Sequence, residues 1–408
     1  MSQMNRRRAL QLLAALGTTG LVAGCGTDDE GEPTATGSPI KIGLVAPESG
    51  SGRTIGEDVV NGFELYLATH GQRLGGHPVT LLKADEGDNA KTGQEAVNGL
   101  LKQGVLALTG VVNPTVMSGI RDIVEKARVP LIGSNASPVS LQSVVYIWRT
   151  SYVLDEPGRA LGAYLKQRLP AGSRVVIIAP EGGASLDVVH GFRQGFGVDD
   201  PRIAGDPVWT NPTADPDESE YVSDIRQALN RRPTAIFCHF SGTAAIQFIK
   251  QLRRHRPAYT GPIYAPGFLT EGSVLNEARG VLVDDKTERL LPGPIQTVSN
   301  YSADLNNNAN RIFASAYRKT FNVSPSTYAM ASYDAAQVLD GAIRIAGANP
   351  TPQQVNLALG RVGQIDSPRG VWQFNQPRTP QQRWYLRTVQ FDGRLLSNVM
   401  LNEIATLG

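Results

Sequence analysis

The sequence of 408 residues contains only two cysteines, Cys25 and Cys238, and only five histidines. Cys25 lies at the end of an apolar N-terminal segment and is predicted below to carry a lipid, so only Cys238 remains and no disulfide framework is predicted. Cys238 lies in the apolar run TAIFCHF and is predicted to be a core residue. The histidines form neither an H-E-x-x-H motif nor a Cys/His cluster, so no metal and no cofactor are predicted. The 39 basic and 37 acidic side chains nearly balance, which argues against nucleic acid as a partner.

Recognisable catalytic motifs are also missing. The chain has no G-x-S-x-G elbow and no readable triad, so no catalytic residue is assigned and the protein is predicted not to be an enzyme. The loop 48–56 (ESGSGRTIG) has three glycines, and Asp85 ends the next predicted strand, roughly as in a dinucleotide site. Its first glycine does not directly follow the strand, because residues 47–49 intervene. We therefore interpret it as a strand–helix loop at the edge of a sheet.

The start of the chain has the features of a targeting segment. Three arginines at 6–8 precede an apolar run, 9–23, that is short for a membrane span of about 20 residues. The run ends in VAGC at 22–25, which resembles the lipobox of bacterial lipoproteins, where the chain is cut before a lipidated cysteine. We predict a signal peptide at 1–24 and a lipid on Cys25. A buried cysteine in an apolar helix is the alternative, and the arginines also resemble a twin-arginine export signal.

The stretch 25–39 (CGTDDEGEPTATGSP) is too polar to bury apolar area, so it is predicted to be a flexible tether. Cleavage before Cys25 removes three of the 39 basic side chains and no acid, which leaves 36 basic and 37 acidic side chains. No later apolar run reaches about 18 residues, so the body is predicted to be soluble.

The body of the chain alternates short β-rich runs with amphipathic stretches. In 55–71, Val59, Phe63 and Leu67 recur at helical spacing, and 92–104 opens with the capping-box pattern TGQE. This alternation predicts an α/β protein of two domains, each with a parallel sheet covered on both faces. The predicted strands are 40–46, 78–84, 105–110 and 129–134 in the first half, and 174–180, 234–240 and 262–267 in the second.

The end of the chain has a different pattern. Residues 309–321 and 327–347 are predicted helices, and 369–374 and 383–391 are predicted to form a final pair of strands.

Several predicted strands are followed by loops rich in Ser, Thr, Asn and Gly at helix starts. Their hydroxyl and backbone N–H groups suit a small anionic or polar ligand, although ordinary helix capping explains any single loop. Because such loops occur in both halves, we predict a ligand cleft between the domains. The loops read VVNPTVMSG, GSNASPVS, APEGGASLD, HFSGTAA and APGFLTE.

The order and spacing of four segments resemble the type I periplasmic binding proteins of the branched-chain amino acid (leucine/isoleucine/valine) branch. The resemblance covers nearly all of 40–400 and implies two doubly wound, mostly parallel lobes, joined by three crossovers, that close on a ligand. By position, lobe 1 is 40–150 plus 295–360, and lobe 2 is 151–294 plus 361–408. The segments are IKIGLVAPESG with GEDVVNGFELYL, ARVPLIGSNASPVSL with YIWRTSYVLDEPGRALGAYL, RVVIIAPEGGASLDVVHGFRQGF, and STYAMASYDAAQVLDGAI.

The resemblance assigns the ligand carboxylate to loops of lobe 1. Asn135 falls where a backbone N–H donates and Ser137 where a hydroxyl donates, while Asn113 and Thr115 lie around the family's serine. Ser49, in the loop after the first strand, completes the predicted groups of this lobe.

On the other side of the cleft the match to the family fails. Ala184 and Thr243 stand at positions that are usually aromatic, and Phe268 stands where an acid pairs with the ligand's ammonium. In lobe 1, Ile55 replaces the aromatic residue that covers the ligand side chain. The other predicted ligand-binding residues on the lobe 2 side are Tyr152, Asp155 and Ser185.

Burying an ammonium without a carboxylate costs several kcal/mol. The sequence therefore favours an aromatic or aliphatic carboxylate, or an amide, with its body toward Phe268 and Tyr152. An amino acid remains possible if Glu181 or Asp155 replaces the missing acid, or if Phe268 simply packs inside lobe 2.

The resemblance implies an extracytoplasmic receptor, lipid-anchored to the outer face of the cell membrane, that delivers a small-molecule ligand to an ABC permease as a monomer. A ligand sensor without transport and an exported α/β enzyme are the alternatives.

Overall fold

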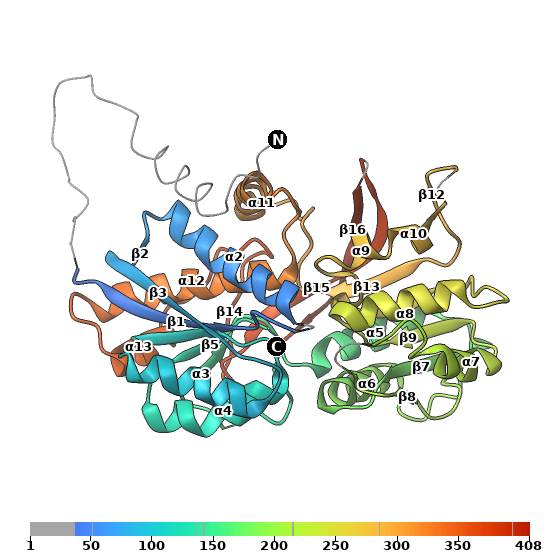
Figure 1. Ribbon diagram of the computed structural model, residues 1–408, viewed down its shortest axis with the longest axis horizontal. Coiled ribbons are helices and arrows are strands. Elements are labelled where there is room, and N and C mark those ends of the chain that lie inside the picture. The colour runs from blue at the N-terminus through green and yellow to red at the C-terminus, as the bar shows by residue number, and fades with distance from the viewer. Residues whose placement is uncertain are drawn as a thin grey trace, which may run out of the picture.

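The computed structural model describes residues 37–50, 52–135, 137–141, 143–213, 216–284, 286–393 and 395–408. The predicted signal peptide, Cys25 and most of the predicted tether lie outside these residues. The described chain forms two halves side by side (Figure 1), each built on its own sheet.

The first sheet has the strand order β2-β3-β1-β4-β5-β6. All neighbours are parallel except the β2–β3 hairpin, and β1 lies centrally with β3 and β4 on its two sides. The short runs are apolar because a parallel sheet is covered on both faces. The bounds are β1 Ile40–Ala46, β2 Arg73–Leu74, β3 His77–Asp85, β4 Ala107–Gly110, β5 Leu131–Gly133 and β6 Ile147–Arg149.

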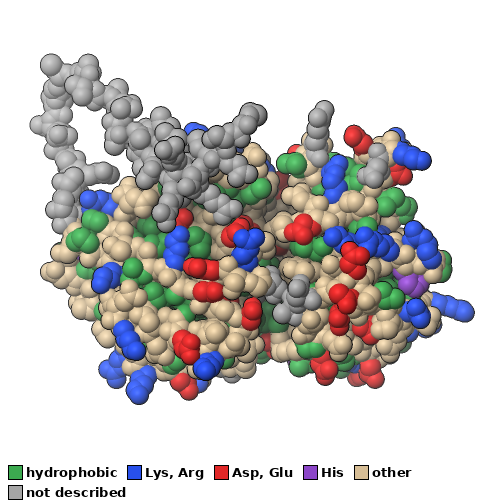
Figure 2. Space-filling model, in the orientation of Figure 1, with side chains coloured by type: hydrophobic (Ala, Val, Ile, Leu, Met, Phe, Trp, Pro, Cys, Tyr) green, Lys and Arg blue, Asp and Glu red, His purple; other side chains and the backbone are tan. Residues whose placement is uncertain are grey.

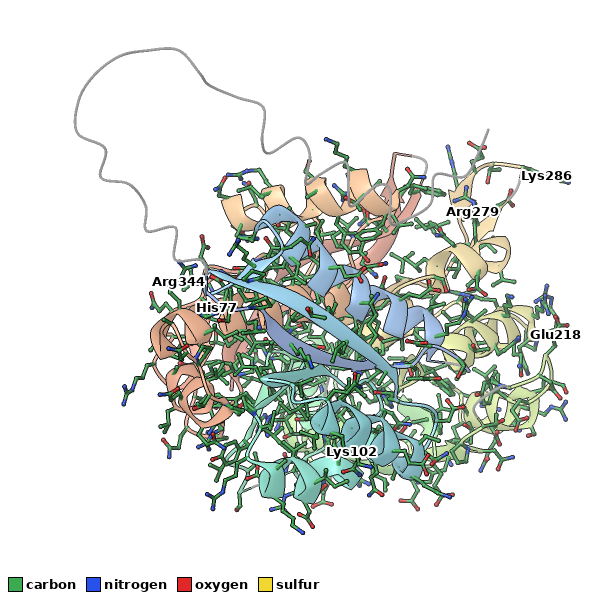
Figure 3. All side chains as sticks on the ribbon, turned by 60° about the vertical axis from the view of Figure 1, so that its left-hand side comes forward. His77, Lys102, Glu218, Arg279, Lys286 and Arg344 are labelled. Carbon is green, nitrogen blue, oxygen red and sulfur yellow. The ribbon has the colours of Figure 1, made fainter. Side chains whose placement is uncertain are left out.

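Helices from two distant parts of the sequence cover the first sheet. The apolar face of α2 is buried as its spacing predicted, since Val59, Phe63 and Leu67 are almost inaccessible to solvent. Helix α12 packs along α2, and its C-terminal end lies beside the β2–β3 hairpin, where Figure 3 shows Arg344 near His77. The helices are α2 Arg53–Thr69, α3 Ala90–Lys102, α4 Pro114–Ala127, α11 Asn308–Phe321, α12 Thr327–Ala346 and α13 Pro352–Leu359.

The second sheet has the order β14-β15-β13-β10-β9-β7-β8, and β16 pairs with β15. Its β7–β10 and β13 strands are parallel, whereas β15 runs antiparallel to β13 and to β16. A hairpin, β11–β12, stands apart. The bounds are β7 Val175–Pro180, β8 Val208–Thr210, β9 Ala235–Cys238, β10 Ile263–Pro266, β11 Val283–Asp284, β12 Arg289–Leu290, β13 Ile295–Ser299, β14 Gln373–Phe374, β15 Pro380–Asp392 and β16 Leu395–Leu407.

Two helices of the second half approach each other unusually closely. An added Cβ on Gly191 of α6 would lie 2.1 Å from the carbonyl oxygen of Asp155, and one on Gly158 of α5 would lie 2.2 Å from that of Val188. Only glycine at these two positions allows the backbones of α5 and α6 to lie so close together, which holds the start of α5 against α6. The helices here are α5 Asp155–Arg168, α6 Gly183–Phe196, α7 Val222–Asn230, α8 Gly242–Arg254, η1 Gly267–Thr270, α9 Val274–Glu277 and α10 Arg279–Leu282.

The chain passes between the two halves three times, which confirms the predicted fold class. The first passage is 150–154, the second is 300–307, and the third is the start of β15. One buried side chain joins all three, because the Gln382 amide donates to the Ser151 carbonyl (3.1 Å) and accepts from Asn300 (2.8 Å).

The structure corrects the predicted division of the chain. Strand β13, at the start of the segment 295–360 assigned to lobe 1, pairs with β10 and β15 in the second sheet. Residues 361–379, assigned to lobe 2, contact both halves: β14 pairs with the start of β15, but Arg369 forms an ion pair with Asp334 of α12 (2.9 Å), and the Arg378 carbonyl accepts from the β6 backbone (3.0 Å). Tertiary contacts, not local pattern, decide these boundaries. Below, lobe 1 means β1–β6 with α2–α4 and α11–α13, and lobe 2 means β7–β10, β13, β15 and β16 with α5–α10.

One local prediction is wrong and another is incomplete. Helix α3 is capped by Asn89, whose side chain accepts from the backbone of Lys91 and Thr92, so the TGQE pattern is not its capping box. The predicted final pair of strands forms in part, since β14 pairs antiparallel with the start of β15, but the main partner of β15 is the long strand β16, which was not predicted. By contrast, Cys238 is fully buried as predicted, and burial raises the pKa of its thiol.

Candidate functional site between the two lobes

The predicted lobe 1 groups lie at the carboxyl edge of the first sheet, where an unpredicted residue, Glu86, occupies the centre. Its carboxylate accepts the backbone N–H groups of Val112 and Asn113, each at 2.8 Å. Burial raises the pKa of Glu86 to about 7, while these two hydrogen bonds lower it. The backbone N–H of Asn113 therefore already has an acceptor within the protein.

Helix capping explains the side chains of the same loop. Asn113 caps α4 by accepting from Thr115 N (2.9 Å), and Thr115 itself is exposed. Ser49 is also exposed and donates to Asp85 (3.1 Å). In the next loop, the Asn135 side chain donates to the Val112 carbonyl (2.7 Å) and so joins the loops after β4 and β5.

Ser137 differs from these residues. It is 1% exposed, and its hydroxyl has no hydrogen-bond partner among the described residues. Its backbone is held by the first passage between the lobes, donating to Tyr152 (2.9 Å) and accepting from Leu154 (3.0 Å). A buried hydroxyl without a partner is costly, so Ser137 is well suited to donate to a ligand.

The facing edge of lobe 2 carries a histidine that the sequence reading did not select. The hydroxyl of Ser185, in the first turn of α6, lies 2.9 Å from Nδ1 of His239, at the end of β9. Burial lowers the pKa of His239 to about 4, so the ring is neutral at neutral pH. Thr243, in the first turn of α8, is half-buried.

Phe268, in η1, meets rings from other parts of the molecule. Its centroid lies 5.9 Å from that of Tyr152, 6.1 Å from Tyr328 and 5.7 Å from His239. Tyr328 belongs to α12 of lobe 1, so Phe268 packs between the lobes and not only inside lobe 2. We call these four residues the ring cluster.

Three acids near the ring cluster, Asp155, Glu181 and Glu271, are paired or exposed, and burial raises the pKa of a fourth, the buried Glu156, to about 8. Asp155 forms an ion pair with Arg159 (3.6 Å), and Glu181 is exposed. Glu271, three residues beyond Phe268, is buried and forms an ion pair with Arg387 (2.6 Å). None of the three is a buried, unpaired carboxylate that could compensate a ligand's ammonium.

The two edges are in direct contact as well. The backbone N–H of Val139, in the loop after β5, donates to Asp187 of α6 (2.9 Å). The loops predicted to face each other across a cleft therefore meet in this structure, and the ring cluster fills the space beside them.

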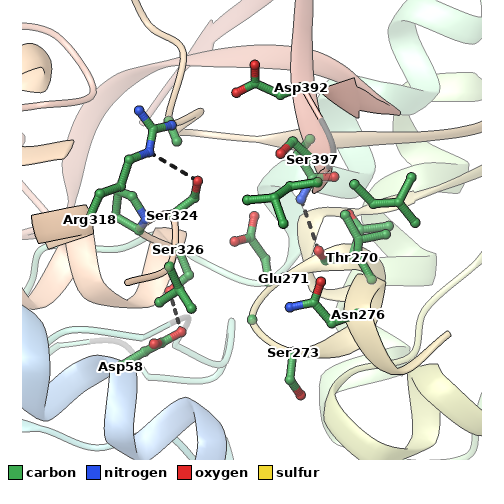
Figure 4. A pocket seen from close by; sticks show the side chains of 18 of the residues that line it. Asp58, Thr270, Glu271, Ser273, Asn276, Arg318, Ser324, Ser326, Asp392 and Ser397 are labelled. Atoms are coloured by element: carbon green, nitrogen blue, oxygen red, sulfur yellow. Dashed lines mark hydrogen bonds between the residues drawn. The ribbon is translucent and has the colours of Figure 1, made fainter. Parts of the chain in front are cut away.

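A cavity of about 1450 Å³ lies beside the ring cluster, and none of the ten predicted ligand-binding residues lines it. Figure 4 shows Asp58, Ser324 and Ser326 of lobe 1 facing Thr270, Glu271 and Asn276 of lobe 2 across it. Acidic side chains lie on both sides of the boundary between the halves in Figure 2. The cavity is lined mainly by polar side chains, in contrast to the ring cluster.

The described residues contain no group of three or more His, Cys, Asp or Glu side chains placed to hold a metal ion. Within the same residues, the helices lack the length and apolar character needed to cross a membrane.

Comparison with known proteins agrees with this architecture. The profile of the family described as periplasmic binding protein matches residues 39–394. The chain belongs to this family. Among its relatives is the Leu/Ile/Val-binding protein homolog 6 of Brucella melitensis, 24% identical over 364 residues, which are 86% of this chain and 87% of the relative.

Solved structures of solute-binding proteins resemble the whole chain. A solute-binding protein of an ABC transporter from R. palustris, in complex with benzoate, has a TM-score of 0.78 and 26% identity, covering 90% of this chain and 97% of that one. A leucine binding protein from Thermotoga maritima has a TM-score of 0.77 and 17% identity, covering 90% and 98%. The predicted membership of the branched-chain amino acid branch of type I periplasmic binding proteins is confirmed.

The structure thus adds four residues to the site, Glu86, His239, Glu271 and Tyr328. His239 ends a predicted strand and Tyr328 starts a predicted helix, so both had a positional signal. Glu86 and Glu271 also lie near the ends of predicted strands, but their hydrogen-bond partners come from distant segments and could not be read from the sequence.

Proposed function

We propose that this protein binds a small carboxylate between its lobes, with an aromatic acid favoured over an amino acid, and delivers it to an ABC importer. It would do so as a lipoprotein anchored through Cys25 on the outer face of the cell membrane, without catalysing a reaction. An aliphatic carboxylate or an amide fits the same groups.

The observation that carries this proposal is the ring cluster. Phe268 stands where the resemblance places the acid of amino acid receptors, and its neighbours are two tyrosines and a neutral histidine. A flat apolar ligand ring would pack well among such rings, whereas an ammonium there would lose its hydration without a compensating charge.

The polar groups of the facing edge support a carboxylate. The Ser137 hydroxyl is buried and has no partner among the described residues, so it can donate to an anion. The relative from R. palustris, described with benzoate, supports an aromatic acid, while the Brucella relatives are described as Leu/Ile/Val-binding.

Thermal unfolding and titration calorimetry with benzoate, 4-hydroxybenzoate and leucine test the ligand class. A ligand at 100 times its Kd stabilises the protein by about 2.7 kcal/mol. We expect benzoates to raise the unfolding midpoint and leucine to leave it unchanged. The reverse result would show that an amino acid mode operates despite Phe268.

Delivery and anchoring need separate tests. Uptake of the labelled ligand by cells with and without the protein distinguishes an importer's receptor from a sensor, because a sensor would bind the ligand without changing uptake. Mass spectrometry of the N-terminal fragment tests the lipid on Cys25, and an unmodified cysteine still preceded by residues 1–24 would refute the anchor.

A further inference from the structure

Glu271 joins the two lobes directly. It follows η1 in lobe 2, and its Oε2 accepts the backbone N–H of Thr327, the first residue of α12 in lobe 1, at 3.1 Å. The first N–H groups of a helix have no partner within the helix and carry a partial positive charge, so a carboxylate binds there favourably. The contact therefore links a charged group of one lobe to a helix end of the other.

Within lobe 2, Arg387 holds the carboxylate of Glu271 in place. The other oxygen of Glu271 lies 2.6 Å from Nη2 of Arg387 in β15, and both side chains are at most 4% exposed. Arg387 is itself fixed, since it donates to the carbonyl of Tyr301 (2.9 Å) and to the hydroxyl of Thr297 (3.3 Å). Glu271 is thus oriented toward lobe 1 by a buried cation.

Hydrogen bonds within lobe 1 hold the N-terminus of α12 in place. Ser326 caps α12 by accepting from Ala329 N (3.2 Å). Its hydroxyl donates to Asp58 of α2 (2.7 Å), a hydrogen bond that is drawn in Figure 4. Asp58 also accepts from the hydroxyl of Tyr317 (3.0 Å). The N-terminus of α12 is thus held in lobe 1 by Ser326, while the N–H of Thr327 points to Glu271 of the other lobe.

The contact lies where surfaces of the two lobes face each other. It borders the cavity of about 1450 Å³, which lies between α2, the end of α11 and the loop 322–326 on one side and η1, α9, β15 and β16 on the other. A Cβ built on Gly272 of lobe 2 would lie 3.8 Å from Asp58 of lobe 1, so the opposing surfaces nearly touch there. Rotation of one lobe away from the other would widen this cavity and separate Glu271 from Thr327.

We propose that Glu271 is a latch that holds the lobes closed by capping the N-terminus of α12, and that it acts as a positioning residue for ligand binding without touching the ligand. Ligand and latch then stabilise the same closed state, so loss of the latch lowers the affinity for any ligand of the cleft. The inference does not depend on the ligand's identity.

Distances between the lobes test the latch without a ligand. Spin labels on Ser118→Cys of α4 and His190→Cys of α6, both exposed positions in opposite lobes, report the interlobe distance in a Cys25→Ser background. The native Cys238 is buried and does not react with the label. We expect the Glu271→Gln variant to shift the ratio of closed to open molecules toward open by on the order of tenfold.

A second pair of variants separates the latch from general stability, because Glu271→Gln also leaves Arg387 unpaired. Thr327 is at the first position of α12, where proline is well tolerated, and Ser326 has the extended backbone that precedes proline. Both Thr327→Pro and Thr327→Ala remove the hydroxyl, which donates to Asn300 (2.8 Å), but only Thr327→Pro also removes the donor N–H. We expect Thr327→Pro to open the lobes further than Thr327→Ala does.

The exposed Glu277→Gln variant on nearby α9 controls for the loss of one negative charge and should leave the distances unchanged. If folded Thr327→Pro and Thr327→Ala proteins gave the same distances as each other, the latch would be refuted. That result would leave the proposed ligand class untouched, since no ligand is present in the measurement.

Discussion

The two edges that meet between the lobes bury titratable groups in opposite ways. At the lobe 1 edge, an acid, Glu86, holds two backbone N–H groups, and at the lobe 2 edge a base, His239, contacts a serine hydroxyl. Burial raises the pKa of the acid to about 7 and lowers that of the base to about 4. Desolvation favours the uncharged form of both groups, which makes the facing surfaces less charged than their composition suggests.

The two edges differ in the side-chain groups that they offer to a ligand. Lobe 1 offers a buried hydroxyl, Ser137, without a partner among the described residues, and lobe 2 offers the ring of Phe268. A ligand with an anionic head and an apolar body matches this division. Four measurements test this difference between the two edges.

Replacement of Phe268 by alanine should have the largest effect. The ring is buried between the lobes, so its loss leaves a cavity and should lower the free energy of unfolding by about 3–5 kcal/mol. Benzoate affinity should fall by roughly 100-fold or more in calorimetry, since 2.7 kcal/mol corresponds to that factor. Phe268→Leu, which keeps apolar volume, should lose less. Equal behaviour of Phe268→Ala and the wild type would remove the ring cluster from the site.

Replacement of Glu86 by alanine leaves two buried N–H groups without their acceptor and should cost about 2–3 kcal/mol of unfolding free energy. Because the folded pKa of Glu86 is raised from 4.5 to about 7, its stabilising contribution is full below pH 4.5 and declines as the pH rises through 7. The difference in the free energy of unfolding between the wild type and Glu86→Ala, measured by denaturant titration, should therefore become smaller as the pH rises from 4.5 through 7.

The exposed Glu95→Ala variant is the control for Glu86 and should show neither effect. If the difference in the free energy of unfolding between the wild type and Glu86→Ala grew with pH, the Glu86 carboxylate would be charged and stabilising in the folded protein.

Replacement of His239 by glutamine tests the opposite pH dependence at lobe 2. Its folded pKa is lowered from 6.5 to about 4, so the wild type should lose roughly 1–3 kcal/mol of unfolding free energy as the pH falls across that range. His239→Gln should lack this loss, while His190→Gln at an exposed position should retain it. Identical pH profiles for the wild type and His239→Gln would contradict the burial of a neutral ring.

Replacement of Ser137 by alanine should have the smallest effect. The hydroxyl has no partner among the described residues, so the free energy of unfolding should change by less than about 0.5 kcal/mol. Benzoate affinity should fall on the order of tenfold, because one hydrogen bond to a charged group is lost. Ser223→Ala, exposed on α7, is the matched control. Unchanged affinity would remove Ser137 from the proposed site.

Much of the fold could be predicted because its signals are local. The strand runs are short and apolar, and α2 buries the Val59, Phe63 and Leu67 face that its spacing indicated. Strand β16 could not be read in this way, since most of its residues are only partly buried and its pattern does not alternate. The boundary errors at β13 and at 361–379 arise because neither segment shows locally which lobe it joins.

The candidate site was harder to predict than the fold. The sequence placed hydroxyl and amide groups at the right edges, but it gave no information on which of them are already bonded. Asn113 and Ser137 look equivalent in the sequence, yet Asn113 caps α4 and bonds Glu86, whereas the Ser137 hydroxyl has no partner among the described residues.

Local sequence patterns were enough to predict most of the strands and helices, their order and the two-lobed class. Which polar groups are already bonded, which rings meet and how the lobes are joined became clear only from the folded chain. The physical reason is that the partners lie far apart in the chain: 26 residues separate Glu86 from Val112, 56 separate Glu271 from Thr327, and 231 separate Ser151 from Gln382.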